Sequence, residues 1–217
     1  MTTSGYTNPL WNRYAHLHAS VTDSFKLSLL RESVEYLTGD ILDCGCGTAK
    51  IAPFLVDRPD VDSYIGVDLA PEMVKVARWM VSQWGRENFV VKESAIEAVE
   101  DNYSSIVSIH SYYTWPEPMG VLEHIHRILQ PGGSFVLATP NERLDMKRLL
   151  RESSKELIAH PDFDKFQCLD LELAGNPKAL FADMDTLVEQ TRTLGFRVLE
   201  CHQRHYLGGV NFLVLSK

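Results

Sequence analysis

The chain has 217 residues, of which 45% are hydrophobic, 23% charged and 10% aromatic. This composition excludes disordered and collagen-like proteins, and the length favours one compact domain with room for an appendage. Twenty-one lysines and arginines stand against 29 aspartates and glutamates, which gives a net charge of -8. Because a negative chain lacks the basic surface that neutralises phosphates, we expect no nucleic-acid partner.

No apolar run reaches the roughly 20 residues that a membrane span requires, and the N-terminus has no basic stretch followed by an apolar one. We therefore expect a cytoplasmic protein without a membrane partner. The cysteines are expected to be free thiols, because a chain of this size needs no disulfides to fold. They are Cys44, Cys46, Cys168 and Cys201.

Apolar runs alternate along the chain with stretches of helical periodicity. In chain order, the pattern predicts a helix over 24–37, a strand over 40–44, a helix over 49–56, a strand over 63–68, a helix over 71–83, strands over 88–92 and 104–109, a helix over 119–129, a strand over 133–139, a helix over 184–194 and strands over 196–202 and 210–216. This alternation predicts an α/β fold with a doubly wound, Rossmann-like, seven-stranded sheet that is mostly parallel. Only residues 203–209 separate the last two strands, so we expect an antiparallel hairpin there.

Two segments lie outside this alternation, and we assign both to a single domain spanning residues 1–217. Residues 1–23 carry Tyr6, Trp11 and Tyr14, which form either an aromatic lid with substrate contacts or an ordinary amphipathic core stripe. Residues 141–183 are an insertion after the fifth strand, helical around 144–158 and broken at Pro161 and Pro177. Such an insertion lies above the carboxyl ends of the strands, where open parallel sheets bind ligands.

The first predicted strand runs into a glycine-spaced turn. Gly45 and Gly47 allow the backbone to approach a ligand closely. A dinucleotide-binding turn has a third glycine where this chain has Lys50, and the acid Asp43 would repel a pyrophosphate. The turn therefore suits a cationic ligand, with the alternative that Asp43 only caps it. A second acid, Asp68, ends the next strand, where a carboxylate can accept both hydroxyls of a ribose.

Together these features resemble the class I S-adenosylmethionine-dependent methyltransferases over residues 40–217. The resemblance implies that S-adenosylmethionine is the cofactor and that its methionine part is held by Asp43, Gly45 and Gly47. It implies that Asp68, with Leu69 beside it, grips the ribose. It also implies that the adenine is flanked by Ser94, Ala95 and Ile96, and that the last strand is inserted antiparallel between the fifth and the sixth.

The chain departs from the family pattern at three places. Ala49 stands where a third glycine is common, and Ser94 stands where an acid often meets the adenine. The stretch after the fourth strand is unusually aromatic, with Tyr112, Tyr113 and Trp115. Their ring faces can stabilise a sulfonium through cation-π contacts, so we expect them at the cofactor and the substrate. This departure leaves the acceptor open.

Three residues are candidates for catalysis. His110 ends the fourth strand beside the expected sulfonium position and is either a general base that also contacts the cofactor or a structural histidine. Tyr113 is the second candidate. Asn141 follows the fifth strand and either orients the substrate or caps the insertion helix.

We expect no metal site. Cys44 and Cys46 lack a second ligand pair at zinc-binding spacing. Two histidine pairs are also poorly spaced for one ion. Two residues apart on a helix, the side chains point about 200° apart; three apart on a strand or its turn, they face opposite sides if both residues are extended. These pairs are His124 with His126 and His202 with His205.

A sulfonium is already activated, so the enzyme has mainly to hold a nucleophile in line with the methyl–sulfur bond and exclude water. The sequence therefore predicts methyl transfer to a small-molecule acceptor in secondary metabolism, by a monomer or homodimer. A short lid and one insertion can enclose a drug-sized ligand but not a folded partner. Two alternatives stay open: cyclisation of S-adenosylmethionine itself to azetidine-2-carboxylate with release of methylthioadenosine, and non-catalytic binding of S-adenosylmethionine.

Overall fold

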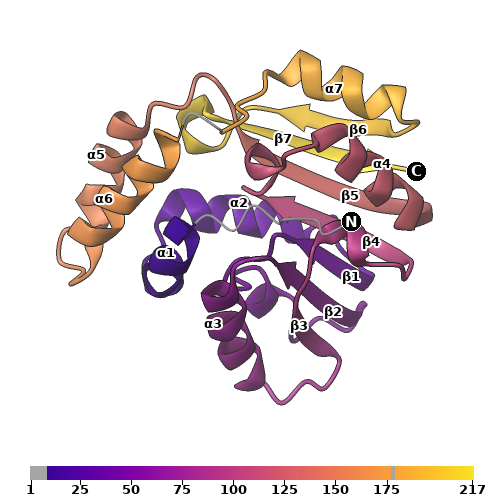
Figure 1. Ribbon diagram of the computed structural model, residues 1–217, viewed down its shortest axis with the longest axis horizontal. Coiled ribbons are helices and arrows are strands. Elements are labelled where there is room, and N and C mark those ends of the chain that lie inside the picture. Colours follow the sequence, from indigo (N-terminus) through magenta and orange to yellow (C-terminus); the bar gives the residue numbers. More distant parts are fainter. Residues whose placement is uncertain (1–8, 177–178) are drawn as a thin grey trace.

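Seven strands form one sheet in the order β3-β2-β1-β4-β5-β7-β6 in the computed structural model, which describes residues 9–176 and 179–217 (Figure 1). Strands β3 to β5 in this order run parallel, whereas β7 runs antiparallel to both β5 and β6. The predicted doubly wound sheet and its hairpin are confirmed, with β7 inserted between β5 and β6. The strands are β1 (Gly39–Cys44), β2 (Val61–Asp68), β3 (Phe89–Glu93), β4 (Tyr103–Ile109), β5 (Leu129–Pro140), β6 (Arg197–His202) and β7 (Val210–Ser216).

Helices cover both faces of this sheet because both faces are apolar. On one face, Leu29 of α2 shares a buried cluster with Ile41 of β1. On the other, Leu122 of α4 shares a cluster with Leu42. Successive side chains of a strand point to opposite faces, so Ile41 and Leu42 enter different cores. The helices are α1 (Pro9–Ser20), α2 (Ser24–Val34), α3 (Pro71–Ser82), α4 (Pro118–Ile128), α5 (Met146–Leu157), α6 (Phe163–Ala174) and α7 (Met184–Thr193).

Local sequence signals start most of these helices. Asp23, Asp145 and Asp183 cap α2, α5 and α7, and each carboxylate accepts the backbone N–H three residues later. This bond satisfies a donor that the first helical turn leaves free. Pro71 and Pro118 stand in the first turns of α3 and α4, where the missing proline N–H has no intrahelical partner to lose.

The predicted helix over 49–56 is wrong. The segment forms turns and one short 3-10 helix, η1 (Ala52–Phe54). Ala49 has a φ of 57°, outside the right-handed helical region, and Pro53 removes a backbone donor. These two breaks override the apolar periodicity, so a tight coil follows the glycine turn.

The insertion contains two helices where the sequence predicted one. Helix α5 falls inside the expected 144–158, but α6 was not predicted, and Pro177 lies outside the described residues. At the other boundary, β5 begins at Leu129 rather than at Gly133. The pairing of β4 with β5 shifts register between Tyr103 and Ser105. Tyr103 therefore pairs with Leu129, ahead of the Pro–Gly–Gly segment, and Ser105 pairs with Ser134, after it.

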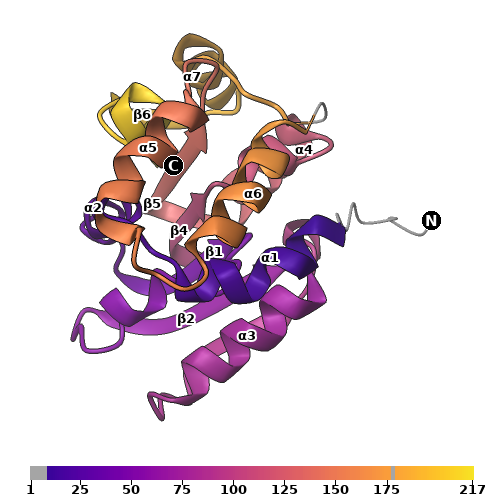
Figure 2. The same ribbon diagram turned by 90° about the vertical axis from the view of Figure 1, so that its left-hand side faces the viewer.

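Helix α1 lies between α3 and α6, as Figure 2 shows. Tyr14 of α1 shares a buried cluster with Met73 of α3 and Leu169 of α6. The N-terminal segment and the insertion therefore pack together rather than separately. All four cysteines are free, as predicted. Within the described ranges, no helix has both the length and the apolar character that a bilayer crossing needs.

Candidate functional site

A cavity of about 850 Å³ lies at the carboxyl ends of β1, β2 and β4. The glycine turn after β1 forms one part of its lining, and side chains of α1, α2, α5 and α6 form much of the rest. Most of the predicted site residues line it: Trp11, Tyr14, Asp43, Gly45, Gly47, Asp68, Leu69, Ala95, Ile96, His110, Tyr113 and Trp115. Ser94, Tyr112 and Asn141 are not part of the lining, and Tyr6 lies outside the described residues.

The glycine turn has a backbone conformation that suits glycine. Gly45 has a φ of 73° and Gly47 a φ of 54°. The N–H of Gly45 donates to the carbonyl of Val67 at 2.9 Å, which ties the turn to β2. A Cβ at Gly45 would lie 2.4 Å from the Cβ of Ser111, so the turn also presses against the segment after β4. The sequence predicted that the glycines let a ligand approach the backbone closely. In the structure, the side chain that approaches Gly45 closely is Ser111 of the same chain.

Asp43 is a buried carboxyl at the edge of the cavity. Its Oδ2 accepts the hydroxyl of Tyr64 at 2.8 Å. Burial raises the pKa of Asp43 to about 7; the charge of Asp68 adds to the rise, while the Tyr64 hydrogen bond opposes it. Because a desolvated carboxylate is costly, a cationic ligand beside it would be stabilised by its charge.

Asp68 anchors the glycine turn and also faces the cavity. Its Oδ2 accepts the N–H of Gly47 at 2.9 Å, and its Oδ1 accepts the N–H of Ala70 at 2.8 Å. Burial raises the pKa of Asp68, and these backbone hydrogen bonds oppose the rise. Each carboxylate oxygen can accept a further hydrogen bond, so the geometry is compatible with a ligand hydroxyl.

The stretch after β3 contributes an apolar wall. Ala95 and Ile96 line the cavity as predicted, whereas the Ser94 hydroxyl donates to the carbonyl of Ala95 at 3.0 Å. The sequence reasoning missed two acids beside them, Glu93 and Glu97, which both line the cavity. Glu93 precedes Ser94 by one residue and Glu97 follows it by three. Both lie next to the place where the family often has an acid at the adenine, so the sequence did contain a signal for them.

His110 lies at the end of β4 with a φ of 58°. Its backbone N–H donates to the carbonyl of Ala138 at 2.8 Å, and its ring meets the edge of Tyr206 at 5.1 Å. Both ring nitrogens are buried, and neither has a hydrogen-bond partner among residues 9–176 and 179–217. Burial holds the pKa of His110 well below its usual value. The imidazole is therefore neutral and has free hydrogen-bonding capacity where it lines the cavity.

The aromatic segment after β4 divides between the cavity and the core. Tyr113 and Trp115 line the cavity, and Tyr113 packs against Trp11 of α1 at 6.4 Å between ring centroids. Tyr112 is buried in the core, and its hydroxyl donates to Gln190 of α7 at 2.8 Å. The structure therefore brings Tyr113 and Trp115 to the predicted site but not Tyr112.

Asn141 is fully buried and bonded within the chain. Its Nδ2 donates to the carbonyl of Gly208 at 3.1 Å and to Oδ1 of Asn211 at 3.2 Å, and its Oδ1 accepts the N–H of Arg143 at 2.9 Å. These bonds connect the start of the insertion to β7 and to the loop before it. Asn141 therefore has neither of the two expected places, because it does not line the cavity and because Asp145 caps the insertion helix α5.

Two lysines line the cavity close to the glycine turn. Lys50 donates to the carbonyl of Val21 at 2.6 Å and to the hydroxyl of Thr22, which ties the glycine turn to the start of α2. Lys26 of α2 lines the cavity, and in the described part of the chain no carboxylate lies within 4.0 Å of its ammonium. Burial lowers the pKa of Lys26 to about 8. Tertiary packing brings Lys26 to the glycine turn, whereas Lys50 follows Gly47 by three residues in the turn's own sequence.

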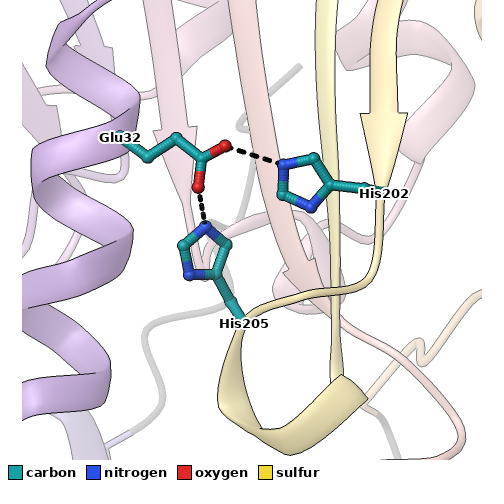
Figure 3. A group of neighbouring side chains, drawn as sticks. All are labelled: Glu32, His202 and His205. Atoms are coloured by element: carbon teal, nitrogen blue, oxygen red, sulfur yellow. Dashed lines mark hydrogen bonds and ion pairs between the residues drawn. The ribbon is translucent and has the colours of Figure 1, made fainter.

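A second polar cluster lies outside this cavity (Figure 3). His202 Nε2 lies 2.9 Å from Oε1 of Glu32, and His205 Nε2 lies 2.7 Å from Oε2 of the same carboxylate. Two extended residues at this spacing would face opposite sides, but β6 ends at His202 and the chain turns before His205, so both rings face Glu32. Arg204 also contacts Glu32, at 2.7 Å.

Glu32, His202 and His205 present atoms within 4.8 Å of one another, a grouping able to approach a metal ion. The Nδ1 of His202, however, accepts the N–H of Arg204 at 3.3 Å, which favours a proton on Nε2 facing Glu32. The contacts present thus describe a polar network that joins α2 to the hairpin, with Arg204 as the charged partner of Glu32. The other pair, His124 and His126, diverges: His124 bonds the Val99 carbonyl at 2.9 Å, and His126 packs on Phe196.

The profile of the methyltransferase domain family matches residues 21–200. The chain belongs to this methyltransferase family. It is 29% identical over 149 residues to malonyl-[acyl-carrier protein] O-methyltransferase of Paenibacillus sp. (strain JDR-2), an alignment that covers 63% of this chain and 54% of that protein. The chain thus matches about half the length of that relative.

Solved structures share the fold of this methyltransferase chain. The mycolic acid cyclopropane synthase CmaA1, complexed with SAH and CTAB, superposes with a TM-score of 0.66 at 17% identity, covering 88% of this chain and 84% of that one. The [4+2]-cyclase SpnF also gives a TM-score of 0.66, at 15% identity, covering 88% of this chain and 80% of that one.

Proposed function

We propose that the chain binds S-adenosylmethionine in this cavity and transfers its methyl group to a small-molecule acceptor. One observation carries the proposal: two acids, the buried Asp43 and the half-buried Asp68, lie at the ends of neighbouring parallel strands beside a glycine turn whose N–H groups are bound by Asp68 and by the Val67 carbonyl of β2. Family membership and the shared fold support it. The role in secondary metabolism and the cytoplasmic location belong to the same proposal.

The residues fit the parts of S-adenosylmethionine. Asp43 offers a carboxylate to the cationic amino-acid end, and Asp68 has acceptor capacity for ribose hydroxyls. Ile96 gives the adenine an apolar wall, and the ammonium of Lys26 suits the ligand's carboxylate. The bound sulfonium supplies an electrophilic methyl group. The chain's task is to orient the acceptor and exclude water, which Tyr113 and Trp115 serve as cavity walls.

The nucleoside released from S-adenosylmethionine tests this proposal. Incubation with S-adenosylmethionine and candidate acceptors is expected to yield S-adenosylhomocysteine only when an acceptor is present, read by chromatography with mass detection. Calorimetry with S-adenosylhomocysteine provides the binding control. Absence of any uptake of either nucleoside by the folded chain would refute the proposed function.

Cofactor affinity is expected to depend on the ionisation of Asp43. The pKa of this carboxyl is raised to about 7, so the affinity for a cation that needs the ionised form should rise by roughly tenfold per pH unit up to pH 7 and then level off. Above about pH 8 the affinity should fall, because Lys26 then loses the charge that meets the ligand's carboxylate. Titration calorimetry with S-adenosylmethionine between pH 5.5 and 8.5 measures this slope. Asp43→Asn should flatten it, whereas Asp40→Asn, on the same strand but outside the cavity lining, should retain it. A slope unchanged in Asp43→Asn would contradict the role of this carboxyl.

Intramolecular cyclisation of S-adenosylmethionine is the second candidate function. An aromatic cavity wall next to a neutral His110 would suit it, and the [4+2]-cyclase with the same fold performs a reaction other than methyl transfer. Methylthioadenosine released without any acceptor would establish cyclisation in place of methyl transfer. Binding without turnover would instead indicate a non-catalytic role.

A further inference from the structure

Asp170 of α6 is an acid in the cavity wall that no sequence motif indicated. Its Oδ1 accepts the hydroxyl of Tyr14 at 2.8 Å, so α1 and α6 hold one side of the carboxylate. Its Oδ2 has no hydrogen-bond partner in the described part of the chain, and the residue lines the cavity. One carboxylate oxygen is therefore available to a ligand.

Aromatic rings surround this carboxylate. Tyr14 of α1 stacks on Phe166, which lies on α6 like Asp170, with 5.6 Å between the ring centroids. Tyr113 meets Phe181 edge-on, with 5.8 Å between the centroids. All four side chains line the cavity. Aromatic faces next to a carboxylate form an environment that favours an organic cation over an anion.

The charged groups near Asp170 compensate its charge only in part. They are Asp23, Lys26 and Lys50, and within the described residues neither lysine comes within 4.0 Å of the Asp170 carboxylate. The Lys50 ammonium is bound to the Val21 carbonyl, and Lys26 suits the carboxylate of the cofactor under the proposed function. Burial raises the pKa of Asp170 to about 6, so the group is ionised at neutral pH but remains a useful proton acceptor.

Building on the proposed methyl transfer, we propose that Asp170 recognises a protonated amine on the acceptor and takes its proton. The acceptor class is then a primary or secondary amine on an apolar body. The ammonium gives one proton to Oδ2 and becomes a neutral amine with a free electron pair. That pair forms the new nitrogen–carbon bond while the carbon–sulfur pair stays on sulfur, and Asp170 later releases its proton to solvent, so charge is conserved.

Asp170 is better suited than His110 to accept this proton. The pKa of His110 is held well below its usual value, so its imidazole competes poorly for a proton at neutral pH. An anionic acceptor at the free Oδ2 would be repelled by the Asp170 carboxylate. A neutral alcohol would gain one hydrogen bond but no charge pairing.

Binding of three matched ligands to the chain saturated with S-adenosylhomocysteine tests the inference. The probes are phenethylamine, 2-phenylethanol and phenylacetate, measured by titration calorimetry at pH 7.5. Phenethylamine is expected to bind at least about tenfold more tightly than the other two, as a charge-assisted hydrogen bond implies. Its affinity should fall as the pH drops below 6, because Asp170 then becomes protonated.

Asp170→Asn should remove the preference for the amine and its pH dependence while the affinity for S-adenosylhomocysteine stays unchanged. Asp164→Asn, on the exposed side of the same helix, is the matched control and should bind as the wild type does. No binding of phenethylamine, equal affinities for the three probes, or a preference that survives Asp170→Asn would overturn the inference. The probe comparison in the wild type decides the question even if the variant does not fold. Failure to bind S-adenosylhomocysteine would instead refute the proposed function.

Discussion

Gly45→Ala is expected to abolish measurable binding of S-adenosylhomocysteine and to lower the free energy of unfolding by about 2 to 5 kcal/mol. A φ of 73° is unfavourable for alanine. The added Cβ would also lie 2.4 Å from the Cβ of Ser111, which is itself fixed by hydrogen bonds to Cys44 and Ser108. Strain and overlap act together, so the turn must shift. Urea denaturation and calorimetry measure the two effects.

Two further variants separate the causes. Gly120→Ala adds the same methyl group to an exposed helical glycine with nothing within 4 Å, and should stabilise the chain by roughly 0.5 to 1 kcal/mol. Ser111→Gly combined with Gly45→Ala should recover part of the lost stability, because it removes the overlapping atom while the φ strain remains. Wild-type stability and binding in Gly45→Ala alone would disprove the packing described for the turn.

Asp68→Ala is expected to weaken binding of S-adenosylhomocysteine by roughly 1 to 3 kcal/mol, or about 5- to 150-fold in the dissociation constant. The substitution removes the proposed acceptor for the ribose hydroxyls. It also leaves the N–H of Gly47 and of Ala70 without their carboxylate partner, so the turn loses an anchor. Titration calorimetry gives the change directly.

Asp62→Ala is the matched control for this prediction. It removes an exposed carboxylate from the same strand, outside the cavity lining, and should leave the dissociation constant as in the wild type. If Asp68→Ala also bound as the wild type does, the assignment of Asp68 to the ribose would have to be abandoned.

Local sequence patterns predict the sheet and the part of the site that lies at the strand ends. Strands buried on both faces leave near-continuous apolar runs, and the carboxyl ends of neighbouring parallel strands meet at one edge. The positions of Asp43, Gly45 and Asp68 at the cavity follow from these local facts. Sequence order also predicted the hairpin, because a short connection cannot cross over the sheet.

Long-range packing places the remaining side chains of the site. Asp170 and Lys26 reach the cavity because α6 and α2 pack over the strand ends, a contact between distant segments that leaves no local periodicity. Chain direction after β6, not spacing, turns His205 toward Glu32. The placement of Tyr113 in the cavity and Tyr112 in the core likewise depends on which neighbours pack against a 3-10 turn. Local sequence thus sets strands and turns, whereas the side chains that would meet an acceptor depend on long-range packing.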